Sequence, residues 1–513
     1  MNDPHLTDRD LEQIAGENLD AAAIQGQLQK FIRGTTPVNL VRPCTPEDGI
    51  ECPSPEVRLH WINTYDTLAD TLKVVKFIPA SGAATRMFKT WFSLLQGEEE
   101  DSANILRQTG DAIKRYPFVH DLEEKIREEG ATIDQWRQNG EIKKILETIL
   151  LAEGLNYGDA PKALIKFHQY DDTARTALEE HLAEAAGYGR SQGNISRIHI
   201  TVSPEFLDRV KRHLQEIMPE YEQRYGISYE VEFSVQKTST NTIAVDPDNR
   251  PFRDEEGKLL FRPGGHGALL ENLAQIDGDL IFIKNIDNVS REEMQDVNQS
   301  AKKMLAGLFL IIRQHLFSSL TLLASGNVTD DQLREMYEYC RQSLHLDLPA
   351  GFLSLPRKEQ REILFTAMNR PIRVCGMVRN TGEPGGGPFW VRDEKGRLSL
   401  QIIEQFQVNT VDPNQLAIWS SSTHFNPVDL VCGIKDFRGN PFNLKDFADQ
   451  DAVCITVKSE KGRSLKALEL PGLWNGSMAR WISVFVDVPM ETFTPVKVVE
   501  DLLRGEHRPP SVK

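Results

Sequence analysis

A short segment at residues 76–89, KFIPASGAATRMFK, combines an apolar stretch, a turn of small residues and two cations. Its pattern predicts the end of a buried strand over residues 74–78, a tight turn at 79–82 and a helix that opens at Ala83. The first backbone amides of a helix have no partner within it, and the helix dipole favours a negative ligand beside them. Arg86 and Lys89 would add positive charge at the same place. The segment therefore predicts an anion site; the alternative is an ordinary strand–turn–helix corner of an α/β domain.

Three further polar clusters follow predicted strands or turns, where open α/β sheets bind their ligands. Lys162 comes directly after a Gly-Asp-Ala-Pro turn, and His266 lies in the glycine-rich segment 264–267. Asp287 follows the apolar stretch 280–283, and a carboxylate there suits Mg²⁺, which binds few protein oxygens and keeps water and phosphate as other ligands. Taken singly, these features also fit a surface lysine, a turn and a helix cap. Their joint order favours a ligand site.

The elements that would carry these clusters alternate along the chain, which predicts a mixed or mostly parallel sheet covered by helices. Prolines and glycines at 34–56 forbid regular structure and predict a linker, or an ordered loop over a site with Arg42 as a ligand contact. Helices are expected at 7–33, 57–73, 90–155, 174–187, 204–218 and 291–370, and strands at 74–78, 198–202, 229–235, 280–283 and beyond 371.

Six segments stand out in order along the chain: SGAATR (81–86), PKALI (161–165), PGGHG (263–267), NIDN (285–288), FNPVDL (425–430) and FTPVK followed by DLL (493–497 and 501–503). In this order they resemble motifs of the sugar nucleotidyltransferases, and the later ones are similar to those of the eukaryotic-type UDP-sugar pyrophosphorylases. The chain as a whole also resembles a bacterial family catalogued as a domain of unknown function.

The resemblance implies a Rossmann-like nucleotide-diphospho-sugar transferase fold (GT-A-like), a mixed sheet flanked by helices with helical insertions. It implies Mg²⁺-dependent transfer of a nucleotidyl group from a nucleoside triphosphate to a sugar 1-phosphate. The expected ligands are a nucleoside triphosphate or nucleotide sugar and a sugar phosphate. The expected parts are an N-terminal helical region with the proline-rich loop (1–73), a catalytic domain with insertions near 90–155 and 291–370 (74–470), and a short C-terminal segment (471–513).

The same resemblance implies roles for individual residues. The turn would hold the base and phosphates. Arg86 and Lys162 would neutralise the triphosphate, and Lys497 would lie on the sugar-phosphate side. The implied catalytic residues are Arg86, Lys162 and Lys497; the nucleotide-binding residues Pro79, Ala80, Ser81, Gly82, Thr85, Gln236, Gly265 and His266; the sugar-binding residues Asn288 and Asn426; and the metal ligands Asp287 and, more weakly, Asp429.

The turn departs from the family pattern, because Ser81 and Ala84 stand where the family has glycines. Three hypotheses therefore remain open. The first is a sugar nucleotidyltransferase, the second a glycosyltransferase of related fold that consumes a nucleotide sugar, and the third a non-catalytic nucleotide-sugar-binding protein.

Composition narrows the classes of partner. A net charge of −16 over 513 residues argues against non-specific nucleic-acid binding, because the overall field repels phosphate backbones. The six cysteines contain no CxxC pair, which argues against a zinc ribbon. The polar N-terminus predicts no signal peptide and a cytoplasmic protein. The apolar run 306–312 is shorter than a membrane span and predicts a buried helix, so no membrane partner is expected.

Overall fold

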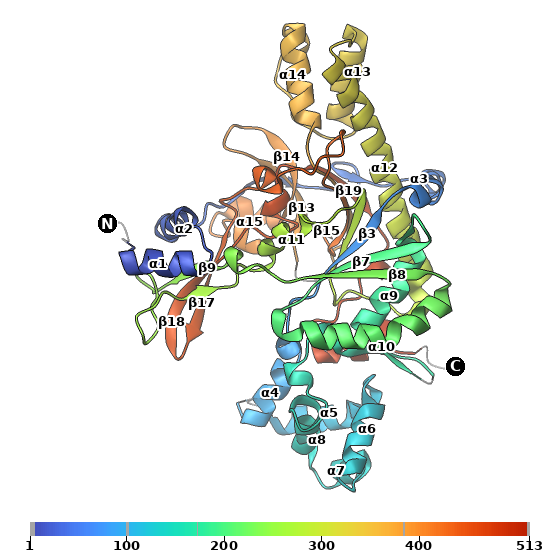
Figure 1. The fold of residues 1–513 in the computed structure, drawn as a ribbon, viewed down its shortest axis with the longest axis vertical. Helices are drawn as coiled ribbons and strands as arrows, with labels where there is room; N and C mark the ends of the chain where they lie inside the picture. The colour runs from blue at the N-terminus through green and yellow to red at the C-terminus, as the bar shows by residue number, and fades with distance from the viewer. Residues whose placement is uncertain (1–5, 99–101, 172, 383–384, 510–513) are drawn as a thin grey trace. The chain divides into compact units, whose positions relative to one another are not determined.

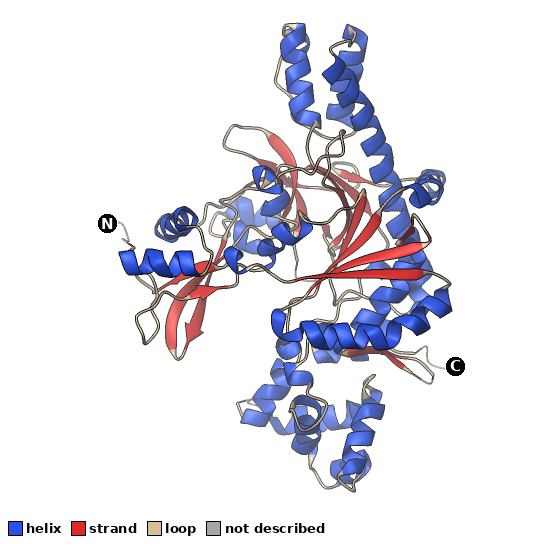
Figure 2. Ribbon diagram, viewed as in Figure 1, coloured by secondary structure: helices blue, strands red, loops and turns tan. Residues whose placement is uncertain are grey.

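The computed structural model describes residues 6–98, 102–171, 173–382 and 385–509, so the acidic run at 98–101, predicted to be a solvated face, lies largely outside the described residues. Helices and strands alternate, and the α/β class predicted from the sequence is confirmed (Figure 2). The chain forms two compact units. The first comprises Met1–Val75, Gln236–Ile283 and Lys302–Val488; the second comprises Lys76–Val235, Lys284–Ala301 and Pro489–Lys513. The domain boundaries expected from the sequence stay a prediction.

The first unit has a mixed sheet around β12 (Ile372–Arg379), which runs antiparallel to β16 (Asp429–Gly433) and parallel to β19 (Ile482–Asp487). β19 in turn runs parallel to β2 (Ile50–Glu51). Smaller antiparallel sheets have the orders β1-β13-β14 and β10-β9-β18-β17. The other elements are α1 (Asp8–Gly16), α2 (Ala21–Arg33), β1 (Asn39–Pro43), α3 (Pro55–Leu68), β9 (Thr242–Val245), β10 (Phe261–Arg262), α11 (Leu270–Leu273), β11 (Leu280–Lys284), α12 (Gln295–Ser325), α13 (Asp330–Gln342), α14 (Arg357–Met368), β13 (Gly387–Arg392), β14 (Leu398–Ile403), α15 (Pro413–Ser420), β15 (His424–Phe425), β17 (Cys454–Glu460) and β18 (Arg463–Glu469).

The second unit has its strands in the order β3-β7-β6, with β8 parallel to β7. Helices α9 and α10 lie along β7 and β8, and helices α4 to α8 form a separate group within this unit (Figure 1). Its elements are β3 (Val74–Pro79), α4 (Lys89–Gln96), α5 (Ser102–Ala112), α6 (Val119–Glu128), α7 (Ile133–Gln138), α8 (Ile142–Leu150), β4 (Lys166–Gln169), β5 (Ala174–Thr176), α9 (Ala177–Tyr188), β6 (Arg190–Ser191), β7 (Ile195–Thr201), α10 (Leu207–Tyr225) and β8 (Ser228–Ser234).

Two local predictions are wrong. Segment 34–56 is not wholly irregular, because β1 pairs antiparallel with β13 and β2 pairs with β19; prolines are tolerated at the ends and edges of sheets. No α-helix begins at Ala83. Residues Ala84–Arg86 form one 3₁₀ turn, because the Ala84 amide donates to the Ala160 carbonyl at 2.9 Å, and α4 begins only at Lys89.

The long helix α12 contains the apolar run predicted to be buried, and Phe309 within it is fully buried. The apolar stretch is longer than expected. By length and composition alone the segment Glu292–Ser325 could cross a membrane, and half of its most apolar window is buried inside the protein. A Cβ at Gly307 would lie 1.8 Å from the carbonyl oxygen of Trp61, so α12 and α3 pack there with no room for a side chain.

Replacing Gly307 with Ala should lower the free energy of unfolding of the protein by about 3 kcal/mol, because the clash is with rigid backbone. Gly26 is the matched control, since it also lies inside a helix, is exposed, and has no atom within 4 Å of an added Cβ. Gly26→Ala should stabilise by about 0.5–1 kcal/mol. Urea unfolding measures both, and equal effects would contradict the close packing of the two helices.

Candidate active site

Three residues from distant parts of the second unit meet at one carboxylate. The ammonium groups of Lys162 and Lys497 each lie 3.0 Å from Oδ2 of Asp287, from which they are separated by 125 and 210 residues. Oδ1 of Asp287 is buried and has no hydrogen-bond partner among the described residues. The structure therefore brings together three of the residues predicted from the sequence.

The charge of this cluster follows from its geometry. Burial raises the pKa of Asp287, but the two lysine ammonium groups outweigh burial and hold that pKa below its ordinary value. Asp287 is therefore ionised at neutral pH, and the cluster carries a net charge of about +1. This net positive charge attracts anionic ligands.

The C-terminal segment is held to the Asp287 loop by backbone and side-chain hydrogen bonds. The Val496 amide donates to the Asp287 carbonyl at 2.9 Å, and the Thr494 amide donates to Oδ1 of Asn288 at 2.9 Å. The Lys497 amide donates to Oδ2 of Asp501 at 2.7 Å. Asn288, predicted to bind sugar, thus uses its buried side chain to position this segment.

The turn at the end of β3 is less open than the sequence suggests. The Ala80 and Ala84 amides already donate to the carbonyls of Thr201 and Ala160. Among the described residues, no acceptor faces the amides of Ser81, Gly82 and Ala83. A Cβ at Gly82 would meet no atom within 4 Å, so there is open space beside this residue.

Some residues of the turn make hydrogen bonds within the protein, and one cationic side chain makes none with the described residues. Arg86 is exposed and makes no hydrogen bond or ion pair with any part of the chain that the structure describes, so it is available to a ligand. The hydroxyl of Thr85 donates to the Gly158 carbonyl at 3.3 Å. The Ser81 carbonyl accepts from the hydroxyl of Ser203 at 2.7 Å, and Pro79 is the last residue of β3.

A second charged cluster, which we call the α9 cluster, was missed by the sequence analysis. It consists of Lys76, Glu184 and Lys284, whose side chains are at most 1% exposed. Glu184 accepts from Lys284 at 2.6 Å and from Lys76 at 3.1 Å. A signal existed, because each lysine interrupts or ends an otherwise apolar strand (VVKFI and LIFIK).

The α9 cluster predicts that the free energy of unfolding depends on pH. Burial lowers the pKa of Lys76 from 10.5 to about 8. Between these values the unfolded chain holds this proton and the folded protein does not, so stability from this residue rises with pH across that window. Relative to Lys76→Met, the wild-type protein should gain about 3 kcal/mol between pH 8 and 10.5. Urea unfolding of both proteins across this range measures the difference, and a difference that does not change with pH would contradict the assignment.

The remaining nucleotide-binding predictions fall in the first unit. The His266 ring stacks on Trp474 with centroids 4.4 Å apart, and its Nδ1 accepts from the Leu473 amide. Burial lowers the pKa of His266, so the ring is neutral and its Nε2 carries the hydrogen. Gly265 has a φ of +73°, which favours glycine, and the side chain of Gln236 is 3.5 Å from the Thr240 hydroxyl.

Two further predictions, Asn426 and Asp429, also fall in the first unit. The buried Asp429 carboxylate contacts the ammonium of Lys302. Oδ1 of Asn426 accepts from the amide of Val428, a β-branched residue held at a strained φ of +59°. The structure thus shows Asn426 supporting a loop and Asp429 neutralised by a lysine.

The expected Mg²⁺ would need oxygen ligands such as carboxylates. No group of three or more His, Cys, Asp or Glu side chains that could hold a metal occurs in residues 6–98, 102–171, 173–382 and 385–509. Mg²⁺ needs only one or two carboxylates when phosphate and water complete its shell. Oδ1 of Asp287, buried and without a partner, fits that requirement.

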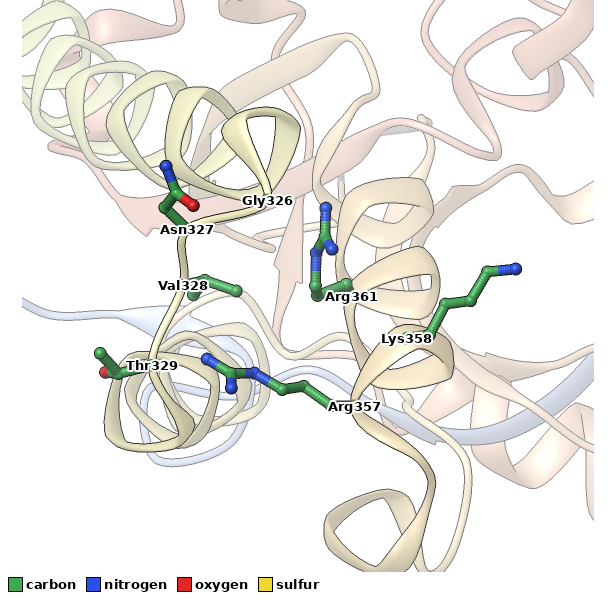
Figure 3. Close-up of a pocket in the computed structure, with 7 residues that line it drawn as sticks. All are labelled: Gly326, Asn327, Val328, Thr329, Arg357, Lys358 and Arg361. Atoms are coloured by element: carbon green, nitrogen blue, oxygen red, sulfur yellow. The ribbon is translucent and has the colours of Figure 1, made fainter.

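A pocket of about 420 Å³ lies elsewhere in the first unit, between the loop that joins α12 to α13 and the start of α14 (Figure 3). Its cations have partners: Arg357 pairs with Asp330 at 3.4 Å, and Arg361 donates to the Leu323 carbonyl at 2.9 Å. These contacts tie the helices together. The lining residues are Gly326, Asn327, Val328, Thr329, Arg357, Lys358 and Arg361, and they include no predicted site residue.

The fold and the site define a mixed α/β protein with an ionised carboxylate between two lysines, beyond the carboxyl end of a buried strand. The chain belongs to the family described as Domain of unknown function (DUF4301), whose model matches residues 7–508. The resemblance of the whole chain to such a family is thereby confirmed. No curated protein matches the chain.

Solved structures similar to the chain include pyrophosphorylases, the class whose motifs the sequence resembles. A mutant UDP-glucose pyrophosphorylase from Leishmania major, in complex with UDP-glucose, is 13% identical over 97% of this chain and 79% of that one, with a TM-score of 0.43. The uridine diphosphate N-acetylglucosamine pyrophosphorylase from Trypanosoma brucei, in complex with an inhibitor, is 12% identical over 98% and 84%, with a TM-score of 0.47.

Proposed function

We propose that this protein transfers a nucleotidyl group from a nucleoside triphosphate to a sugar 1-phosphate, forming a nucleotide sugar and pyrophosphate. The observation that carries the proposal is the contact of Asp287 with both Lys162 and Lys497. These residues come from three of the six segments that follow the motif order of sugar nucleotidyltransferases. The contact supports a shared role for segments that the sequence places far apart.

The reaction needs positioning and charge neutralisation more than covalent help from the protein. A phosphate oxygen of the sugar phosphate attacks the α-phosphorus of the triphosphate in line. A new P–O bond forms, the bond from the α-phosphorus to the bridging oxygen breaks, and pyrophosphate leaves with that electron pair. The free amides of the β3 turn and Arg86 would bind phosphate oxygens.

The two lysines would change partners when substrates bind. In the structure the Asp287 carboxylate pairs with both ammonium groups. A phosphate group offers the same lysines charge-assisted hydrogen bonds, which frees the carboxylate. Mg²⁺ held by Asp287 would neutralise charge on the phosphates when bound. Lys162, whose side chain is 15% exposed, is screened less by water than Lys497, at 55%.

Pyrophosphate release tests the proposal. The purified protein is incubated with Mg²⁺, each of the common nucleoside triphosphates and a panel of sugar 1-phosphates. One pair should release pyrophosphate, and Lys162→Met should abolish most of that release. Lys125→Met is the matched control, because Lys125 is an exposed lysine of the same unit that pairs with Glu128. No release with any pair would reject the proposed activity.

A second candidate is a nucleotide-sugar-binding protein without catalysis. The observation that favours it is the turn itself, where the Ala84 amide is bonded to Ala160 and Ser81 replaces a family glycine. A nucleotide sugar at about 100 times its dissociation constant should then stabilise the protein by about 2.7 kcal/mol in a thermal-shift assay. Stabilisation without pyrophosphate release from any pair would select this candidate.

A further inference from the structure

Helix α9 presents buried polar side chains to strands β3 and β11 and to the loop that follows β11. His181 and Glu184 are three residues apart and therefore lie on one face of the helix, and both are 0% exposed. The helix begins at a capping box formed by Thr176 and Glu179. Polar side chains on a fully buried helix face need partners. Glu184 finds its partners in β3 and at the end of β11, and His181 finds its partner in the loop after β11.

His181 holds the backbone just before Asp287. Its Nε2 lies 3.2 Å from the Asn285 carbonyl oxygen and 3.3 Å from the Ile286 carbonyl oxygen. Carbonyl oxygens only accept, so Nε2 must carry the hydrogen. Burial and the charge of Lys76 lower the pKa of His181 well below its ordinary value, which keeps the ring neutral with its hydrogen on that nitrogen.

Glu184 ties the same helix to both strands. It accepts from Lys76 within β3 and from Lys284 at the end of β11, and Lys76 also donates to the His181 carbonyl at 3.0 Å. β3 continues into the turn that carries Arg86, and β11 continues into the loop that carries Asp287. The α9 cluster thus joins the strand that leads into the predicted anion-binding turn to the strand that leads into the loop of the predicted metal ligand Asp287.

We propose that His181 and Glu184 are positioning residues that set the Asp287 carboxylate between Lys162 and Lys497. The catalytic consequence rests on the proposed function, whereas the positioning itself does not. Apolar side chains of similar volume would pack this helix without the cost of desolvating three charges. Apolar side chains could not hydrogen-bond the carbonyl groups of Asn285 and Ile286, as His181 does. They also could not pair with Lys76 and Lys284 at the same time, as Glu184 does.

Local amide exchange tests the positioning in three variants. His181→Leu removes the donor, His181→Gln keeps an N–H at the same reach, and Leu182→Ala leaves a cavity next to it on the same helix. The amides of Asn288 and Val496, which donate to the Asn285 and Asp287 carbonyls, report on the loop. His181→Leu should speed their exchange about tenfold relative to other amides of the second unit. His181→Gln should restore slow exchange, and Leu182→Ala should show no selective effect on these two amides.

Activity measured on the same proteins separates the two proposals. If pyrophosphate is released, His181→Leu should lower kcat about 10–100-fold, the usual effect of removing an outer-shell partner, and His181→Gln should recover most of it. Faster exchange confined to the Asn288 and Val496 amides in His181→Leu, without any pyrophosphate release by the wild-type protein, would uphold the positioning role and reject the proposed function. Equal exchange in His181→Leu and Leu182→Ala would overturn the positioning role. An unchanged kcat in His181→Leu, in an active enzyme with faster exchange at these two amides, would overturn its catalytic consequence.

Discussion

Replacing Glu184 with Gln should lower the free energy of unfolding by about 3–5 kcal/mol, since it leaves two buried lysines without their counter-charge. Lys76 and Lys284 are 0% exposed, and Glu184 is the carboxylate that both contact. Although burial alone raises the pKa of Glu184, the two ammonium groups hold it well below the ordinary value, so the carboxylate is ionised at every pH at which the protein is handled. Urea unfolding at pH 7 measures the loss.

Two controls separate a missing charge from a damaged core. In the triple variant Lys76→Met, Glu184→Leu, Lys284→Met the whole cluster is apolar and of similar volume, so stability should return to near that of the wild-type protein or exceed it. Glu128→Gln removes an exposed partner of Lys125 and should cost less than about 1 kcal/mol. A Glu184→Gln protein that unfolds at the wild-type urea midpoint would show that the buried lysines do not need this carboxylate.

Lys162→Met should lower the rate of pyrophosphate release about a hundredfold, or about 3 kcal/mol of transition-state stabilisation, if the proposed function holds. Its ammonium is the more buried of the two at Asp287, so solvent screens it less. The same group also donates to the Val496 carbonyl at 2.9 Å. Lys497→Met should have a smaller effect, because that side chain is half exposed.

Steady-state kinetics identify the step that loses stabilisation. A fall in kcat with KM little changed indicates a contact that strengthens in the transition state, and a rise in KM alone indicates ground-state binding. Lys125→Met should leave both constants unchanged. If Lys162→Met retains more than about a third of the wild-type kcat, Lys162 does not neutralise charge in the transition state.

Local patterns predicted most of the elements on which the site depends. The apolar stretches of β3 and β11 and the strand pattern of β7 and β8 are present in the structure. These features depend on residues within a few positions of each other, which is the range over which periodicity acts. The 3₁₀ turn at Ala84 was missed because its amide bonds to Ala160, which is far along the chain.

Sequence alone identified Lys162, Asp287 and Lys497 as separate candidates, by their positions after strands or turns and by the order of motifs. Only the tertiary structure placed both lysines on one carboxylate oxygen, because that contact joins residues 125 and 210 positions apart. The α9 cluster was decided in the same way: a lysine inside an apolar strand is tolerated only where the fold supplies a buried carboxylate, and Glu184 lies on a helix 108 residues beyond Lys76. Ion pairs between distant segments leave no local periodicity, so the chemistry of this site becomes visible only when the chain is folded.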